Sequence, residues 1–133
     1  MDVLELHARV TREFVRRDLE SYLALMHPDV EFTTVAFGEE RVFRGHAGVR
    51  EWWETLSAKP GYDAYSSAAT ALADDAILIR ARIRAPSQSG GYLDVAALWL
   101  LVSRDGLVWR YRPVGSEEAA RSEYARMAPP DGS

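Results

Sequence analysis

The chain has 133 residues, the length of one typical domain, of which 47% are hydrophobic and 27% charged. These proportions exclude a wholly disordered, collagen-like or coiled-coil protein, and the net charge of −4 at pH 7 argues against a nucleic-acid binder. Because cysteine is absent, disulfides, thiolate-bound metal centres and a thiol nucleophile are excluded as well.

The sequence carries no targeting signal that we recognise. No apolar run approaches the ~20 residues that a membrane span requires. The stretch Met1–Leu6 has neither the basic nor the apolar region of a signal peptide. We therefore expect a cytoplasmic protein without a membrane partner. Lys59 is the only lysine, and the preference for arginine together with many alanines is typical of a GC-rich bacterial genome.

The first third of the chain is predicted to be mostly helical. Apolar residues recur at three- and four-residue spacing from Val3 to Arg17, which indicates an amphipathic helix. Asp18 is a candidate N-cap for a second, shorter helix, whose apolar positions extend to Met26. The segment His27-Pro28-Asp29 ends that helix, because the residue before proline disfavours the α conformation.

A strand pair and a third helix follow. The β-branched and aromatic residues Val30–Ala36 predict a strand that turns at Phe37–Glu40 and returns over Arg41–Arg44. The next apolar periodicity predicts a helix over about Ala47–Ser57, which Lys59-Pro60-Gly61 ends.

The second half of the chain is predicted to be a meander of strands closed by a helix. The strands are expected at Tyr62–Ala73, Ala76–Ala85, Tyr92–Ser103 and Leu107–Val114, with a tight turn at Arg104-Asp105-Gly106. Ser116 is a candidate cap for a helix that runs to about Met127, and residues 128–133 are expected to be a flexible tail. Helices followed by a meander predict a single α+β domain over residues 1–127, with helices on one face of a curved sheet.

Four local segments then resemble one family. These are Arg17-Asp18-Leu19-Glu20, Leu25-Met26-His27-Pro28-Asp29-Val30-Glu31-Phe32, the run from Phe43 to Trp53, and Arg104-Asp105-Gly106-Leu107-Val108. Together with the order of elements, they resemble the SnoaL-like branch of the nuclear transport factor 2-like superfamily, over roughly Leu6 to Glu123. The resemblance implies a cystatin-like cone, in which N-terminal helices pack on a curved antiparallel sheet around a central pocket. This fold carries isomerases, cyclases, epoxide hydrolases and binding modules, so it does not select one function.

The catalytic set of the ketosteroid isomerases is not found at the matching positions. Those enzymes use a carboxylate base together with a tyrosine and a protonated carboxyl group that form an oxyanion hole. The tyrosine position holds Val10, the base position falls at Val35 or Ala36, and the protonated-acid position falls at Trp99. None of these side chains performs the required step.

The Asp–Arg–Asp set of the limonene epoxide hydrolases is not found either. Its arginine would be Arg80 or Arg82, but the residue two positions further on is again arginine. The second aspartate position holds Pro113, or Tyr111 in the other alignment, and neither acts as a base at neutral pH.

Asp94 is the nearest candidate for an acid–base residue. SnoaL-type cyclases use an aspartate on an apolar pocket wall, and Asp94 stands between Leu93 and Val95. Facing a cavity, this carboxyl would have a raised pKa. The alternative, which we weigh above it, is that Asp94 lies on the solvent face and forms an ion pair with an arginine of a neighbouring strand.

Aromatic residues are the candidate lining of the pocket. The five positions that we expect to line it are Phe32, Thr34, Trp53, Trp99 and Tyr111. Trp52 and Trp53 are adjacent on one helix, so their directions differ by ~100°, and the resemblance favours Trp53 as the one that points inward. The alternative is that these aromatic side chains fill the core.

Arginines form a stripe along one strand and histidines are scattered. Arg80, Arg82 and Arg84 share a face, and Arg82 is a candidate anion contact. The alternative is an outer sheet face or a dimer interface, with the isoleucines of this strand facing the core. His7, His27 and His46 lack metal-ligand spacing, so we expect no metal. His27 is interpreted as a helix-end residue.

These observations lead to two functional hypotheses. The first is a protein that binds a small, largely apolar molecule in an aromatic-lined cavity; as an enzyme it would be a cofactor-independent isomerase, cyclase or hydrolase. Asp94 would then be the acid–base residue, and Tyr111 or Thr34 the orienting hydroxyl. The alternative is a non-catalytic homodimerising or interaction module with the same fold. Its outer-face residues Leu98, Leu100 and Val102 would bury against a second copy.

Overall fold

The computed structural model describes residues 2–36, 39–58, 63–86 and 90–127. In chain order, the elements are α1 (Val3–Val15), α2 (Leu19–Leu23), β1 (Met26–Ala36), β2 (Glu39–Arg44), α3 (Gly45–Ser57), β3 (Asp63–Ala73), β4 (Ala76–Pro86), β5 (Tyr92–Arg104), β6 (Leu107–Val114) and α4 (Glu117–Met127). The predicted order and types of element are therefore confirmed. The expected flexible tail at 128–133 lies outside the described residues.

The N-terminal helices begin at their capping aspartates. The Asp2 carboxylate accepts a hydrogen bond from the Glu5 amide at 2.8 Å, and the Asp18 carboxylate accepts one from the Ser21 amide at 3.1 Å. The cap predicted at Asp18 is thus confirmed.

The second helix is shorter than the sequence predicts. α2 ends at Leu23, and β1 begins at Met26, four residues before the expected strand. The cause is tertiary, because Met26 pairs with Val108 of β6 and the Val108 amide donates to the Leu25 carbonyl at 2.9 Å.

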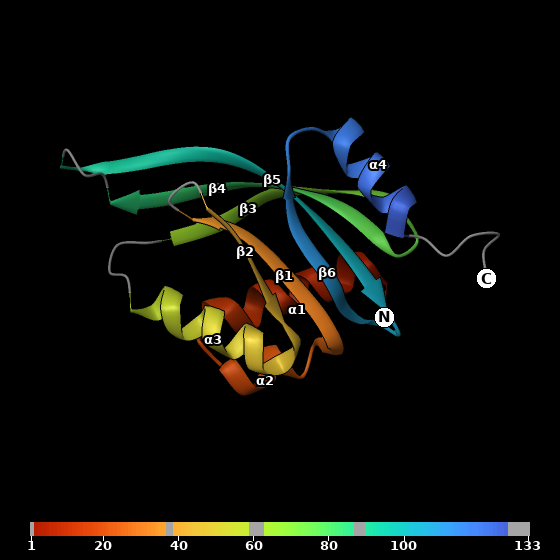
Figure 1. The fold of residues 1–133 in the computed structure, drawn as a ribbon, viewed down its shortest axis with the longest axis horizontal. Coiled ribbons are helices and arrows are strands. Elements are labelled where there is room, and N and C mark those ends of the chain that lie inside the picture. The colour runs from red at the N-terminus through yellow and green to blue at the C-terminus, as the bar shows by residue number, and fades with distance from the viewer. Residues whose placement is uncertain (1, 37–38, 59–62, 87–89, 128–133) are drawn as a thin grey trace.

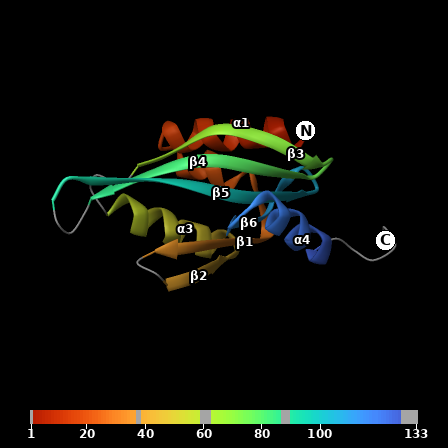
Figure 2. The ribbon, with the colours of Figure 1, turned by 90° about the horizontal axis from the view of Figure 1, so that it is seen from above.

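The six strands form one sheet in the order β2-β1-β6-β5-β4-β3 (Figures 1 and 2). Neighbouring strands are antiparallel except for β1 and β6, which are parallel. The expected sheet was antiparallel throughout. The parallel pair arises because the chain leaves β2 through α3 to the far edge of the sheet, and the meander from β3 then returns until β6 lies beside β1.

The two faces of the sheet carry separate apolar cores. Alternate residues of β4 divide between them: Ile77 and Ile79 belong to one core, and Ala76 and Leu78 to the other. We call the face under α1, α2 and α3 the inner face and the opposite one the outer face. In Figure 1 the three N-terminal helices lie on one side of the sheet and α4 on the other.

Gly48 lets α3 approach the sheet edge closely. A Cβ at this position would lie 2.7 Å from the backbone carbonyl carbon of Phe43 in β2. A side chain there would force α3 away from the strand. The glycine thus brings Val49 and Trp53 of α3 into the inner core, where they are 0% and 8% exposed.

Helix α4 covers part of the outer face that we expected to meet a second copy of the chain. Its first turn is capped as predicted, since the Ala119 amide donates to the Ser116 hydroxyl at 3.0 Å. Leu100 and Val102 are 0% and 2% exposed in the core that α4 closes. These residues are therefore already buried within one chain, and the expectation that they bury against a twin is corrected.

Within the described residues, no helix has the length and apolar character needed to cross a membrane.

Candidate functional site

Seven aromatic side chains meet on the inner face, and we call them the aromatic cluster. The cluster draws on the three N-terminal helices and on three strands: Phe14, Tyr22, Phe32, Trp52, Trp53, Trp99 and Tyr111. Neighbouring rings have centroids 4.9 to 6.4 Å apart. Such separations are typical of aromatic pairs in direct contact.

One half of the cluster links the sheet to α3. Trp99 of β5 stacks on Tyr111 of β6 with centroids 4.9 Å apart. Tyr111 lies 5.1 Å from Phe32 of β1, and Phe32 lies 5.2 Å from Trp52. The sheet brings the first three together because β5, β6 and β1 are neighbouring strands.

The other half lies among the helices. Trp53 is 5.0 Å from Tyr22 and 5.7 Å from Phe14. Trp52 also contacts both, at 6.0 Å from Tyr22 and 6.1 Å from Phe14. Both tryptophans of α3 therefore join the cluster. Trp53 is the more buried of the two, whereas Trp52 is the one that contacts Phe32.

The cluster has a closed end and an open end. Phe32, Tyr22 and Trp53 are 1%, 4% and 8% exposed, whereas Trp52, Trp99 and Tyr111 are only partly buried. The rings contact one another, so in this ligand-free chain they fill the space between sheet and helices. The alternative in which aromatic residues fill the core thus describes much of the cluster. The partly buried rings are the ones that a ligand would meet first.

Four of the five residues expected to line a pocket belong to the cluster. They are Phe32, Trp53, Trp99 and Tyr111. Thr34 is half-buried on β1, two residues after Phe32 and therefore on the same face of the strand. It is paired in register with Arg41 of β2.

Tyr22 is the cluster residue whose role was missed from the sequence. Its spacing within α2 marked it only as an apolar position. Burial raises the pKa of the Tyr22 phenol well above its usual value, and the neighbouring Tyr111 raises that pKa further. At neutral pH its hydroxyl is therefore a hydrogen-bond donor and not a phenolate.

Asp94 lies on the outer face, away from the aromatic cluster. In β5 it has the same parity as Leu100 and Val102 of the outer core, whereas Trp99 has the opposite parity. Its carboxylate accepts a hydrogen bond from Arg82 Nε at 2.8 Å, and its side chain is 50% exposed. This is the solvent-face ion pair of the sequence analysis. We do not carry forward the acid–base role of Asp94 or the anion contact at Arg82.

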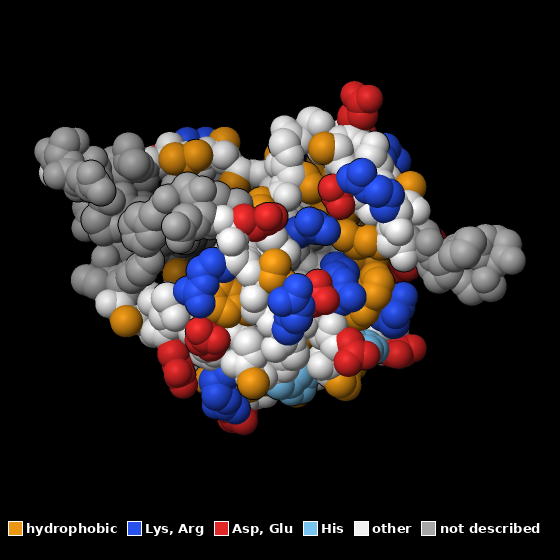
Figure 3. All heavy atoms as spheres, in the orientation of Figure 1, with side chains coloured by type: hydrophobic (Ala, Val, Ile, Leu, Met, Phe, Trp, Pro, Cys, Tyr) orange, Lys and Arg blue, Asp and Glu red, His pale blue; other side chains and the backbone are white. Residues whose placement is uncertain are grey.

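The arginine stripe of β4 also faces outward. Arg80, Arg82 and Arg84 are exposed and alternate with Ile79 and Ala81, which belong to or pack against the inner core. Charged residues of the neighbouring strands share this face: Glu31 of β1 lies 3.7 Å from Arg44 and 3.6 Å from Arg110. Figure 3 shows basic and acidic side chains interspersed over β1 and β2.

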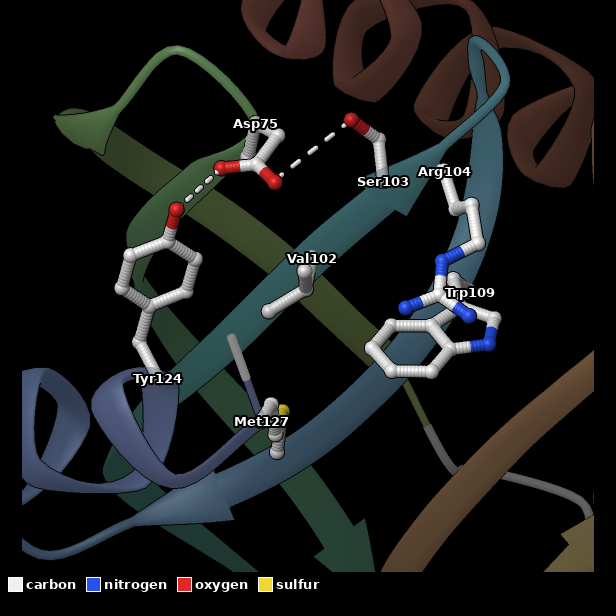
Figure 4. A pocket seen from close by; sticks show the side chains of 7 residues that line it. All are labelled: Asp75, Val102, Ser103, Arg104, Trp109, Tyr124 and Met127. Carbon is white, nitrogen blue, oxygen red and sulfur yellow. Dashed lines mark hydrogen bonds between the residues drawn. The ribbon is translucent and has the colours of Figure 1, made fainter. Parts of the chain in front are cut away.

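A small cavity lies between α4 and the outer face (Figure 4). Its volume of about 20 Å³ is room for about one water molecule. The Tyr124 hydroxyl donates to Asp75 Oδ1 at 2.5 Å, and Arg104 stacks on Trp109 with its guanidinium carbon 3.7 Å from the ring centroid. These contacts attach α4 and the β5–β6 turn to the sheet, and the space is too small for an organic ligand.

The histidines take separate structural positions. His46 Nε2 lies 2.8 Å from the Met26 carbonyl. His27 lies in β1 and not at a helix end as expected; its Nδ1 accepts from the Asp29 amide at 3.0 Å. Among the described residues, no group of three or more histidine, aspartate or glutamate side chains is arranged to hold a metal ion.

Solved structures share this fold. TerC crystallised with polyporic acid matches with a TM-score of 0.70 and 22% identity, over 90% of this chain and 95% of TerC. RV0760c from Mycobacterium tuberculosis, in complex with estradiol-17beta-hemisuccinate, matches with a TM-score of 0.66 and 18% identity, over 87% and 95%. A Δ5-3-ketosteroid isomerase from Mycobacterium sp. matches with a TM-score of 0.64 and 19% identity, over 88% and 95%. The helices on a curved sheet are thus those of a nuclear transport factor 2-like protein.

The family can be stated more narrowly. The SnoaL-like domain family matches residues 7–111, which is most of the chain, and this chain belongs to that family. A search of curated proteins found no significant match.

Proposed function

We propose that this protein binds a small, largely apolar molecule between the inner face of its sheet and its N-terminal helices. The observation that carries the proposal is the aromatic cluster, and in particular its gradient from the enclosed Phe32 to the partly buried Trp99 and Tyr111. Apolar and aromatic walls with a few polar groups are the usual character of a small-molecule site.

Proteins of similar fold support the proposal. TerC and RV0760c were crystallised with organic molecules, and the same fold was used for a computationally designed 17-OHP binder. The cluster of this chain occupies the equivalent layer, between the helices and the curved sheet. A ligand would enter by displacing the partly buried rings, since these lose the least packing when they move.

Binding is proposed here in preference to acid–base catalysis. The carboxylate that the sequence offered for that role, Asp94, lies on the outer face in an ion pair. The polar groups of the aromatic cluster are hydroxyl and indole groups, which orient a ligand without ionising at neutral pH.

Homodimerisation is not proposed as a second function. Two of the three apolar residues expected to meet a twin, Leu100 and Val102, lie under α4. Leu98 is partly buried against the same core.

A thermal-shift screen tests the proposal. The compounds are small apolar ketones, lactones, epoxides, sterols and aromatic acids. A ligand at a hundredfold excess over its dissociation constant stabilises the native state by ~2.7 kcal/mol, which corresponds to a rise of several degrees in Tm. We expect at least one class to give this rise, and a flat response over all classes would contradict the proposal.

A matched pair of tryptophan variants locates the site. Trp99→Ala removes a ring of the cluster, and Trp109→Ala removes a ring of the outer core. We expect the ligand-induced rise to disappear in Trp99→Ala and to persist in Trp109→Ala, each measured against its own ligand-free Tm. Loss in both variants, or in Trp109→Ala alone, would place binding elsewhere.

A further inference from the structure

Tyr22 is the most enclosed polar side chain of the aromatic cluster. It is 4% exposed. Its ring lies 5.0 Å from Trp53, 6.0 Å from Trp52 and 6.3 Å from both Phe14 and Phe32. Four aromatic neighbours therefore hold the ring, and packing fixes its place without help from the hydroxyl.

The Tyr22 hydroxyl makes no hydrogen bond to any residue that the structure describes. Buried tyrosines usually pair this group. In the described part of the chain, the only fully enclosed side-chain polar atom without a partner is His7 Nδ1. The Tyr22 oxygen is thus not sealed by surrounding protein, and it keeps contact with accessible space within the cluster.

Tyr111 borders the same region. Both tyrosine rings contact Phe32, at 6.3 Å for Tyr22 and 5.1 Å for Tyr111. Tyr111 belongs to the open end of the cluster, whereas Tyr22 belongs to the closed end. A molecule that enters past Tyr111 and Trp52 would reach Tyr22 with its leading end.

We propose that the Tyr22 hydroxyl donates a hydrogen bond to a carbonyl oxygen at the leading end of the ligand, which is a flat apolar ketone. This inference rests on the proposed function and narrows its ligand class. The donor is a neutral phenol, so its partner is an oxygen acceptor. A hydrocarbon would leave the hydroxyl unpaired, which is how a site built to hydrogen-bond one group rejects an analogue without it. The aromatic walls suit a flat apolar remainder.

Two probes of matched shape test the inference. 2-Acetylnaphthalene carries a carbonyl oxygen where 2-isopropenylnaphthalene carries a methylene group. Equilibrium dialysis measures the Kd of each for the wild-type protein and for Tyr22→Phe, which keeps the ring and removes the oxygen. We expect the variant to weaken ketone binding about tenfold, equivalent to about 1.4 kcal/mol, and to change alkene binding less than twofold.

Tyr124→Phe is the matched control. It removes a hydroxyl from the outer face, where Tyr124 bonds Asp75, and should leave both Kd values unchanged. If the ketone binds and Tyr22→Phe leaves its Kd unchanged, the inference is overturned and the proposed function stands. Equal weakening of both probes would also overturn it, because the hydroxyl would then serve packing. If neither probe binds at millimolar concentration, the proposed function fails for flat apolar ligands and the inference fails with it.

Thermal unfolding without ligand gives a second, independent reading. A hydroxyl that awaits a ligand contributes no internal hydrogen bond, so Tyr22→Phe should have a Tm equal to or above that of the wild type. A Tm lower by several degrees would show that the hydroxyl has a structural partner, and would overturn the inference.

Discussion

The two faces of the sheet are built from the same strands but are held by different interactions. On the inner face, rings contact rings, and Tyr22 makes no hydrogen bond to the described residues. On the outer face, directional polar contacts dominate: Tyr124 bonds Asp75, and Trp109 lies between two guanidinium groups, with Arg104 at 3.7 Å and Arg110 at 3.9 Å.

This difference indicates which face is suited to a ligand. Ring contacts are non-directional, so a ligand ring replaces a displaced side chain at small cost. Hydrogen bonds and stacked cations lose their geometry when a group moves, so they fix α4 on the sheet. Four substitutions test this comparison, from the largest expected effect to the smallest.

Phe32→Ala should have the largest effect, because it empties the centre of the aromatic cluster. Phe32 is 1% exposed and contacts Tyr22, Trp52 and Tyr111. We expect the free energy of unfolding to fall by about 4 kcal/mol. Chemical denaturation measures this loss, and the thermal-shift response to any ligand found should disappear as well.

Leu100→Ala is its control on the outer face. Leu100 is 0% exposed, so the loss of stability should also be large, about 3 kcal/mol. The ligand-induced rise in Tm should nevertheless persist. Equal loss of the ligand response in both variants would remove the distinction between the faces.

Tyr124→Phe should destabilise the protein by about 1 kcal/mol, the usual worth of one hydrogen bond. The bond to Asp75, followed by burial, raises the pKa of Tyr124 to about 12. Because this pKa is raised in the folded state, the stabilisation is complete below the ordinary value of 10.0 and is lost as the pH rises towards 12. Denaturation at pH 9 to 12 should show this loss in the wild type and a smaller one in the variant. Parallel curves would show that the bond does not contribute.

His7→Leu tests a polar atom of α1. His7 Nδ1 is buried without a partner, and burial lowers the pKa of this imidazole below 6.5. The unfolded chain therefore takes up the proton first on acidification, so the wild type loses stability as the pH falls below 6.5. The variant should show a flatter pH profile between pH 7 and 5. An unchanged slope would mean that other groups carry the acid sensitivity.

Asp94→Asn should have the smallest effect. The ion pair with Arg82 is 45% and 50% exposed, and pairs of this kind contribute at most about 1 kcal/mol. We expect a change in stability below about 0.5 kcal/mol and no change in ligand binding. A loss of binding or of turnover in this variant would restore the acid–base role that the sequence offered.

The sequence alone determined much of the fold. Local chemistry fixes where helices begin, so Asp18 and Ser116 were identified as caps from residue type and position. The turn before β6 was likewise readable, and Gly106 there has a φ of 75°. The alternation of isoleucine and arginine along β4 separated an apolar side from a charged side.

Only the tertiary structure decided how these pieces form a site. Alternation divides a strand into two faces but does not say which layer each face meets, so Asp94 could be placed only once β5 lay between β4 and β6. The same holds for Leu100, whose apolar side chain fits a second copy as well as α4. Tyr22 is one apolar position in a five-residue helix, and its role depends on rings from α1, α3 and β1 that lie far away in the sequence. Periodicity is a local property, whereas a binding site depends on which distant side chains the packed layers bring together.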